Sequence, residues 1–272
     1  MAKKRDAYII DGKHVPGVSA VKGIIDKPHL IPWAVKKSAE YLEDHWKPGV
    51  SYSAIEIEHM IKESKKQWRV ARDTAGDFGD NVHELVGSWI EGQIKDLSVV
   101  RDPKERYALE NFIAVTKGWI WHASEVEVHN REFGFGGTSD GLATLPSGMV
   151  IIPDVKTSNY TGPDHTLQIA MYSHPSSVPV DHDDPALEAK LRELWPKIEE
   201  GRILHFNKDR LTWEVLRRDV KSHWPYIGYF RGVLAWKDKF DPPNHSEYEG
   251  TKNVEDPIIS APAEPVASIH FV

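Results

Sequence analysis

Two aspartates and a lysine stand in a stretch that otherwise has the pattern of two strands joined by a tight turn. The stretch is GGTSDGLATLPSGMVIIPDVKTS, residues 136–158, and the three residues are Asp140, Asp154 and Lys156. If the turn is centred on Ser147, equal steps along both strands place Asp140 opposite Asp154. Opposed residues on one face have Cβ atoms roughly 4.5–5.5 Å apart, where two like charges destabilise the sheet unless a cation neutralises them.

A hard divalent cation is the natural partner for two such carboxylates. Mg²⁺ and Mn²⁺ prefer oxygen ligands, and two carboxylates leave room for water and a phosphate. Since side chains alternate along a strand, Lys156 shares the face of Asp154, and Val155 points into the opposite layer. The ammonium could orient or help to deprotonate an attacking water and stabilise charge on a phosphodiester. In the structural alternative, Asp140 caps a turn, and Asp154 and Lys156 form a surface ion pair.

The composition limits the metals and compartments that fit this chemistry. The 272 residues include no cysteine, which excludes disulfides, thiolate zinc sites and an iron–sulfur cluster, so nitrogen and oxygen must hold any metal. The hydrophobic content of 40% is ordinary for a soluble globular protein. No apolar segment has the length of a signal peptide or a membrane span. We therefore expect a cytoplasmic protein with no membrane partner.

The net charge of -7 argues against a general nucleic-acid coat protein, but one segment is basic. Its lysines and arginines recur at spacings of three and four, so a helix would present them as a stripe that could hold a DNA backbone. This basic stripe consists of Lys62, Lys65, Lys66, Arg69 and Arg72. The alternative is that these side chains only form a solvated helix face. The spacing of the charges, taken alone, favours this alternative.

The segments before the strands are predicted to be mostly helical. Residues 8–16 have the pattern of a hairpin that turns at Asp11-Gly12. Residues 31–46 alternate apolar and charged side chains at helical spacing. Ser53 and Glu56 form a capping box for the next helix, which is expected to carry the whole basic stripe.

Gly76 and Gly79 are expected to break the helical pattern before a separate helix that has His83 near its start. A further helix fits residues 103–121, and residues 125–128 then begin the strands. After the strands, the expected elements are a helix from Pro163, an acidic loop over residues 175–185, a polar helix from Ala186, a hairpin of residues 202–207 and 211–215, and a helix over residues 220–236.

Four motifs together resemble the signature of a known superfamily. GGTSDG followed by IIPDVKTS resembles the PD-(D/E)XK nucleases, with Asp140 as the first acid and residues 153–156 as the PD-x-K element. The RecB-type branch adds a G-x-x-x-H pattern upstream, here ending at His83. It also adds a Q-x-x-x-Y pattern downstream, here Gln168 to Tyr172. The motifs occur in the order of that branch, and the layout is similar to bacteriophage exonucleases that lack an iron–sulfur cluster.

The resemblance implies a role for each matched residue. Four groups would bind Mg²⁺, for which Mn²⁺ substitutes: His83, Asp140, Asp154 and the backbone carbonyl of Val155. Lys156 would act on the water, and Gln168 and Tyr172 would organise the site or contact DNA. Two residues keep an alternative: His83 could be an ordinary core or surface histidine, and Glu125 is either a further acid at the edge of the site or an exposed strand residue.

We therefore expect an α/β fold, with a central mixed β-sheet flanked by helices and a restriction-endonuclease-like core. Residues 1–240 would form a single nuclease domain, followed by a polar, proline-containing tail over residues 241–272. The implied function is a metal-dependent deoxyribonuclease, with an exonuclease of phage DNA replication, recombination or end processing favoured, in the cytoplasm of a bacterial host. Its partners would be single- or double-stranded DNA and a recombination or replication protein. The alternatives are a structure-specific or restriction-like endonuclease and a catalytically silent DNA-binding module.

Overall fold

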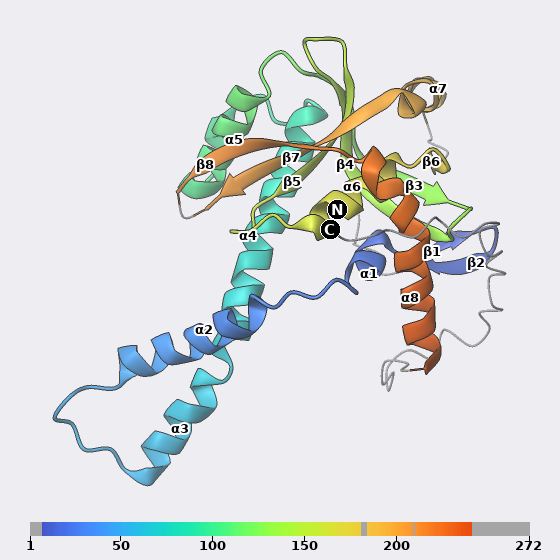
Figure 1. The fold of residues 1–272 in the computed structure, drawn as a ribbon. Coiled ribbons are helices and arrows are strands. Elements are labelled where there is room, and N and C mark those ends of the chain that lie inside the picture. The colour runs from blue at the N-terminus through green and yellow to red at the C-terminus, as the bar shows by residue number, and fades with distance from the viewer. Residues whose placement is uncertain (1–6, 181–183, 209, 241–272) are drawn as a thin grey trace, which may run out of the picture.

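The computed structural model describes residues 7–180, 184–208 and 210–240, and a six-stranded sheet forms the centre of the protein (Figure 1). A separate hairpin precedes it, made of β1 (Ala7–Ile10) and β2 (Lys13–Pro16). The strands of the sheet are β3 (Ile120–Asn130), β4 (Phe135–Thr144), β5 (Val150–Lys156), β6 (Ser177–Pro179), β7 (Ile198–Asn207) and β8 (Thr212–Arg218). The predicted tail, residues 241–272, lies outside the described residues.

The strands follow the order β6-β3-β4-β5-β7-β8, with β5 and β7 parallel and the other neighbours antiparallel. The connection between the parallel pair contains helices, as a parallel crossover requires. The predicted fold class, a central mixed sheet flanked by helices, is confirmed. The predicted first hairpin is confirmed too, because Asp11 and Gly12 form its turn with φ of 50° and 77°.

Helices make up much of the remaining described chain. The α-helices are α1 (Val18–Lys22), α2 (Leu30–His45), α3 (Ala54–Ser64), α4 (Gln67–Ile90), α5 (Pro103–Val115), α6 (Pro163–Ser173), α7 (Pro185–Leu194) and α8 (Ile227–Phe240). Short 3₁₀ segments are η1 (Leu97–Val99), η2 (Trp195–Lys197) and η3 (Lys221–Tyr226). The predicted capping box of α3 is present: the Ser53 N–H donates to the Glu56 carboxylate at 2.7 Å, and the Glu56 N–H donates to Ser53 Oγ at 3.3 Å.

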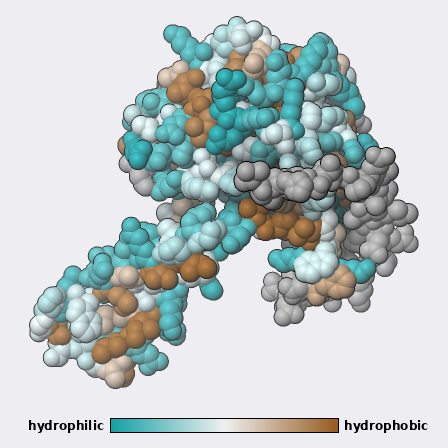
Figure 2. Space-filling view, in the orientation of Figure 1, coloured by the Kyte–Doolittle hydropathy of each residue, from teal (hydrophilic) through white to brown (hydrophobic). Residues whose placement is uncertain are grey.

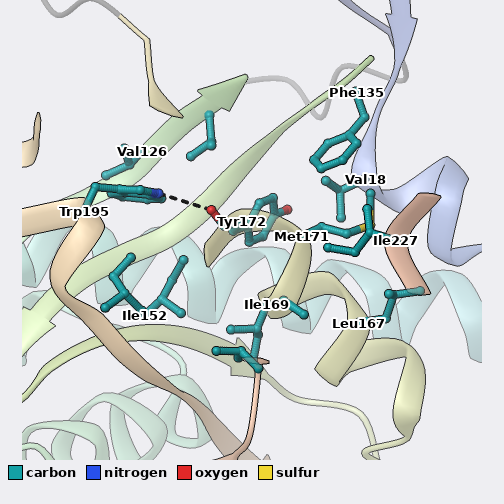
Figure 3. Close-up of a cluster of buried hydrophobic side chains, with 14 of the residues drawn as sticks. Val18, Val126, Phe135, Ile152, Leu167, Ile169, Met171, Tyr172, Trp195 and Ile227 are labelled. Atoms are coloured by element: carbon teal, nitrogen blue, oxygen red, sulfur yellow. Dashed lines mark hydrogen bonds between the residues drawn. The ribbon is translucent and has the colours of Figure 1, made fainter. Parts of the chain in front are cut away.

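The sheet separates two hydrophobic cores. One core packs the sheet against α1, α6, α7 and α8, and the other packs it against α4 and α5. Strand β5 contributes to both because its side chains alternate: Ile152 lies in the first core and Val155 in the second. Figure 3 shows the first core, where the Trp195 indole N–H donates to the Tyr172 carbonyl at 3.2 Å. Helix α6 is thereby fixed against the sheet that carries the candidate site.

The predicted helix break at Gly76 and Gly79 is wrong, because α4 runs through both glycines. A glycine inside a helix destabilises it by about 1 kcal/mol relative to alanine. Burial of the apolar face that includes Val82 and Val86 outweighs this cost. His83 consequently lies in the second half of a long helix rather than near the start of a short one.

The basic stripe was predicted on one helix, and this is also wrong. Helix α3 ends at Ser64, whose hydroxyl donates to the Ile61 carbonyl at 2.9 Å, and α4 begins at Gln67. Such a side-chain bond to the backbone competes with helix propagation. The stripe is therefore divided: Lys62 lies on α3, Lys65 and Lys66 lie at the junction, and Arg69 and Arg72 lie on α4.

Other element boundaries differ from the prediction as well: β3 begins at Ile120 rather than at residue 125, and the helix expected over residues 220–236 is divided into η3 and α8. The helix expected over residues 103–121 ends at Val115, because Gly118 takes a φ of 83° and the chain then enters β3. The segment 175–185 was expected to be a loop. It instead supplies β6, a short edge strand that pairs with β3, before the chain reaches α7.

Helices α2 and α3 and the first part of α4 form an arm that projects from the rest of the protein (Figure 1). Figure 2 shows hydrophobic residues on the surface of this arm, and Leu42, Trp46 and Ile61 are among the exposed apolar side chains there. Within the described ranges, every helix is too short or too polar to span a bilayer.

Candidate active site

The candidate site begins where the ladder between β4 and β5 ends. The ladder consists of two residue pairs: Ala143 with Ile151 and Thr144 with Val150. This register centres the turn on Ser147, as predicted. The ladder does not extend to Asp140 and Asp154, so the expected direct opposition of these acids in the ladder is wrong. Asp140 instead reaches β5 with its side chain, and its Oδ2 accepts the N–H of Val155 at 2.6 Å.

Asp154 and Lys156 form a buried ion pair at the end of β5. Lys156 Nζ lies 2.6 Å from Asp154 Oδ2 and donates to the Val155 carbonyl at 2.9 Å. Asp154 is 1% exposed, so the alternative of a surface ion pair is wrong. Burial opposes the charge of Lys156, but attraction by Asp154 and Asp140 outweighs burial and raises the pKa of Lys156. The pair shares one face of the strand, as the alternation predicted.

His83 approaches the same group from α4, on the other face of the sheet. Its Nδ1 lies 3.6 Å from Asp140 Oδ2. The backbone of Val155 then connects the two pairs, because its N–H binds Asp140 and its carbonyl binds Lys156. The structure therefore brings together His83, Asp140, Asp154 and Lys156, which come from three separate elements.

A close approach between α4 and the end of β5 positions His83. A Cβ at Gly79 would lie 2.9 Å from Thr157 Oγ1, so only glycine fits there with Thr157 in its present position. A Cβ at Gly76, one turn earlier on the helix, would have no atom within 4 Å of it. The glycine of the G-x-x-x-H motif thus has a packing role, since it lets the helix carry His83 to Asp140.

Gln168 and Tyr172 lie next to each other on α6, as their spacing predicted. Gln168 Nε2 donates to the Tyr172 hydroxyl at 3.4 Å. Burial raises the pKa of Tyr172 well above its ordinary value, so the hydroxyl remains protonated. Lys22 Nζ, from the end of α1, donates to Gln168 Oε1. The sequence analysis missed Lys22, because α1 has only five residues and the contact joins positions 146 apart.

A second charged group lies beside Gln168, at the start of α6. Lys27 Nζ lies 2.9 Å from Asp164 Oδ2. His165 Nδ1 accepts the N–H of Gly162, the residue that caps the helix, at 3.2 Å. Burial, followed by repulsion from Lys156, lowers the pKa of His165 to about 3. The imidazole is therefore neutral at ordinary pH and serves as a backbone acceptor.

Glu125 has an unusual backbone conformation within β3. Its φ is 47°, and the ladder with β4 skips it between the paired residues Ser124 and Val126. The same ladder skips Asp140, which lies at the corresponding position of β4. A left-handed conformation costs a non-glycine residue about 1–2 kcal/mol. The Glu125 side chain is exposed, so the expectation of an exposed strand residue is confirmed, and its role as a further acid stays a prediction.

The residues of the basic stripe are exposed and lie outside the group around Asp154. Two of them flank one aromatic ring, since Arg69 Cζ and Arg72 Cζ lie 5.2 and 5.3 Å from the centre of the Trp68 ring. Arg72 also contacts Asp73 at 2.8 Å. At a rise of 1.5 Å per residue, Arg72 and His83 are about 16 Å apart along α4. Arg69 and Arg72 therefore lie on the same helix as His83, nearer to its N-terminus.

The oxygen atoms at the end of β5 suit a divalent cation. Among the described residues, no three histidine, aspartate or glutamate side chains converge into a ready metal site. Both oxygens of the Asp154 carboxylate are nevertheless buried without a hydrogen-bond partner there. Oδ2 lies 2.6 Å from the Lys156 ammonium, which also donates to the Val155 carbonyl, and Oδ1 has no such cation beside it in that part of the chain. A buried carboxylate with an unshared oxygen beside a carbonyl is a fitting ligand group for Mg²⁺ or Mn²⁺.

No protein-family model and no curated protein matches the chain. Among solved structures, the chain is similar to one described as "Crystal structure of SSO0001". The two share 15% sequence identity, the match covers 78% of this chain and 92% of the other, and the TM-score is 0.27. A likeness at this level carries no conclusion about function.

Proposed function

We propose that this protein is a metal-dependent deoxyribonuclease that hydrolyses DNA phosphodiester bonds, and that it acts as an exonuclease. The proposal is supported above all by the group at the end of β5, where Val155 connects Asp140 to the buried pair of Asp154 and Lys156. His83 lies against the same acid. Two acids, a lysine and a histidine that share one strand end are a donor set for phosphoryl chemistry.

The proposed metal ligands are His83, Asp140, Asp154 and the carbonyl of Val155. Mg²⁺, or Mn²⁺ in its place, would supply Lewis-acid stabilisation of phosphate charge and lower the pKa of bound water when held there. The protein fixes its part of this arrangement in advance, because the Val155 N–H holds Asp140 and the packing of Gly79 against Thr157 holds His83.

Lys156 carries the positive charge that acts on the substrate. Its raised pKa keeps the ammonium protonated at neutral pH. An ammonium at this position can orient a water molecule and stabilise the negative charge that builds on the phosphodiester oxygens. The low exposure of Asp154 and Tyr172 keeps bulk water away from one side of the group, which strengthens these electrostatic interactions.

The direct test is cleavage of end-labelled linear duplex and single-stranded DNA with Mg²⁺, Mn²⁺ or a chelator. We expect metal-dependent degradation that Lys156→Ala and Asp140→Ala each abolish. Lys117→Ala is the matched control, since Lys117 is exposed and precedes β3 at the opposite end of the sheet, and it should cleave normally. A folded wild-type protein that cuts none of these substrates would contradict the proposal and favour a catalytically silent DNA-binding module.

Covalently closed circular DNA tests the exonuclease part of the proposal. A strict exonuclease spares the circle and degrades the linear form of the same molecule. Cutting of both forms at similar rates would instead establish an endonuclease, which the same catalytic group could support. A role in phage DNA replication, recombination or end processing, with a replication or recombination protein as partner, is proposed from the motif resemblance.

A further inference from the structure

Lys22 is a cation of the candidate site that the motifs do not include. It ends α1, whose Val18 and Val21 are buried in the core that α6 also lines. This packing directs Lys22 toward α6, where its ammonium donates to Gln168 Oε1. Gln168 in turn donates to the hydroxyl of Tyr172. The lysine is thus fixed by a chain of hydrogen bonds next to the catalytic group.

Lys22 differs from the neighbouring lysines because no acid among the described residues pairs with it. Lys27 is paired with Asp164 at 2.9 Å, and Lys156 is paired with Asp154 at 2.6 Å. In the part of the chain that the structure describes, no carboxylate lies within 4.0 Å of the Lys22 ammonium. An ammonium has three donors, and the amide oxygen of Gln168 accepts only one of them. The arrangement leaves donors and charge for an external anion.

The electrostatic surroundings support the same conclusion. Burial, followed by repulsion from Lys156, lowers the pKa of Lys22 to about 8, while Asp154 and Asp164 act in the opposite direction. The protein therefore keeps Lys22 in an environment that disfavours its charge. A bound anion would relieve this cost, because an opposite charge within a few ångströms favours the charged form.

We propose that Lys22 binds a phosphate oxygen of the DNA substrate, and that Gln168 and Tyr172 hold its ammonium in place for this contact. The inference rests on the proposed nuclease function and names a residue that touches the substrate. Of the two roles expected for the Q-x-x-x-Y motif, it selects site organisation, since Gln168 becomes a positioning residue for Lys22 rather than a direct DNA contact. The phosphate is either the diester that is cut or the terminal phosphate of a strand end.

Cleavage kinetics of the full chain test the role of Lys22. Lys22→Met should lower kcat/KM about 100-fold, the usual loss when one preorganised donor to a developing charge is removed. Lys22→Arg, which keeps the charge, should retain most of the activity, and Lys117→Met is the matched control for loss of one lysine. Activity of Lys22→Met within threefold of the wild type would overturn the inference. If Lys22→Met does not fold, Lys22→Gln is subject to the same criterion.

A change at Gln168 distinguishes a phosphate contact from a merely structural lysine. Gln168→Glu has nearly the same shape, but it supplies the carboxylate that Lys22 lacks and would neutralise it. We expect this variant to lose about as much activity as Lys22→Met while its melting temperature stays at or above the wild-type value. Gln168→Met should lose less. Full activity of Gln168→Glu would contradict the proposal, because a purely structural lysine would accept the acid without loss.

Substrates that carry either a 5′-phosphate or a 5′-hydroxyl end identify which phosphate Lys22 binds. A defect of Lys22→Met that is equal on both ends indicates the diester that is cut, and a defect confined to phosphorylated ends indicates the terminal phosphate. Either result supports the inference. A silent wild-type protein would refute the nuclease function and the inference with it, whereas an active wild type with an equally active Lys22→Met would refute only the inference.

Discussion

Lys156 Nζ lies 2.6 Å from Asp154 Oδ2 and also donates to the Val155 carbonyl. The lysine therefore contacts both groups of β5 that we assign to the metal and leaves Asp154 Oδ1 unshared. It acts as an internal cation that neutralises the buried carboxylate. The same residue is thus expected to matter for stability as well as for cleavage, and the two effects can be measured separately.

Lys156→Met should destabilise the metal-free protein by about 3 kcal/mol, because it leaves the buried Asp154 carboxylate without a partner. The double variant Asp154→Asn with Lys156→Met should lose less, since no buried charge remains. Urea unfolding in the presence of a chelator measures both free energies. Equal losses in Lys156→Met and the double variant would show that the unpaired Asp154 charge is not the cause of the loss.

The basic stripe makes a prediction about salt. Neutralising Lys65, Lys66 and Arg69 with glutamine should reduce the slope of log K against log salt for duplex DNA by up to about 3, since each phosphate contact contributes about 0.9. Binding is measured by fluorescence anisotropy without Mg²⁺. An unchanged slope would remove the stripe from the DNA interface.

A matched triple variant controls for the loss of three positive charges. Lys117, Lys190 and Lys197 belong to segments near the end of the sheet where Val150 pairs with Ile198, opposite the candidate site. Their replacement by glutamine changes the net charge equally. We expect the salt slope of this variant to stay at the wild-type value.

Two glycines of α4 provide a test of helix packing. Gly76→Ala meets no atom within 4 Å and should stabilise the protein by about 0.5–1 kcal/mol through helix propensity. Gly79→Ala should not show this gain, because its Cβ would lie 2.9 Å from Thr157 Oγ1. Thermal unfolding measures the difference. Combining Gly79→Ala with Thr157→Ala should restore part of the gain, and an equal gain in both single variants would disprove the close contact.

The sequence was informative where a pattern was local. The turn centred on Ser147 and the shared face of Asp154 and Lys156 followed from counting along two strands, and the structure agrees. Counting could not show that the ladder stops at Ala143 and that the Asp140 side chain, rather than its backbone, binds β5. The point at which β4 and β5 cease to pair depends on packing from both faces of the sheet, and no local sequence pattern encodes that packing.

Long-range packing explains the other differences. Gly79 was interpreted as a helix breaker because its partner, Thr157, is distant in the sequence. Lys22 was overlooked for the same reason, since its site contacts lie on α6. In both cases the residue type was plain, but its meaning depended on a neighbour that only the folded chain supplies.

The strained position Glu125 gives a prediction with two readouts. Glu125→Gly should stabilise the protein by about 1 kcal/mol, because glycine adopts the φ of 47° without strain. If Glu125 is also an acid of the site, the same variant should need more Mg²⁺ for half-maximal cleavage. Glu125→Asn is the control for the loss of the carboxylate, since asparagine also tolerates this conformation and also lacks the charge. A loss of stability in Glu125→Gly would show that the backbone there is not strained.

His165 predicts how stability depends on pH. Its folded-state pKa is lowered to about 3, by burial first and then by repulsion from Lys156. Below the unfolded-state pKa of about 6.5 the unfolded chain therefore binds a proton that the native imidazole refuses. Protonation would also place a hydrogen on Nδ1, the atom that accepts the Gly162 N–H. Stability should fall as the pH drops from 6.5 toward 3, by up to about 1.4 kcal/mol per pH unit from this group.

His165→Asn removes the titration and keeps an acceptor for the Gly162 N–H. The groups that act electrostatically on this position, Asp164, Lys22, Lys27 and Lys156, remain in the variant. Urea unfolding at pH 7 and pH 4.5 should show a smaller difference for His165→Asn than for the wild type, on the order of 2 kcal/mol smaller. His14→Asn, at an exposed position of β2, should behave as the wild type. If His165→Asn keeps the full acid sensitivity, the histidine is not the buried neutral group that the Gly162 contact indicates.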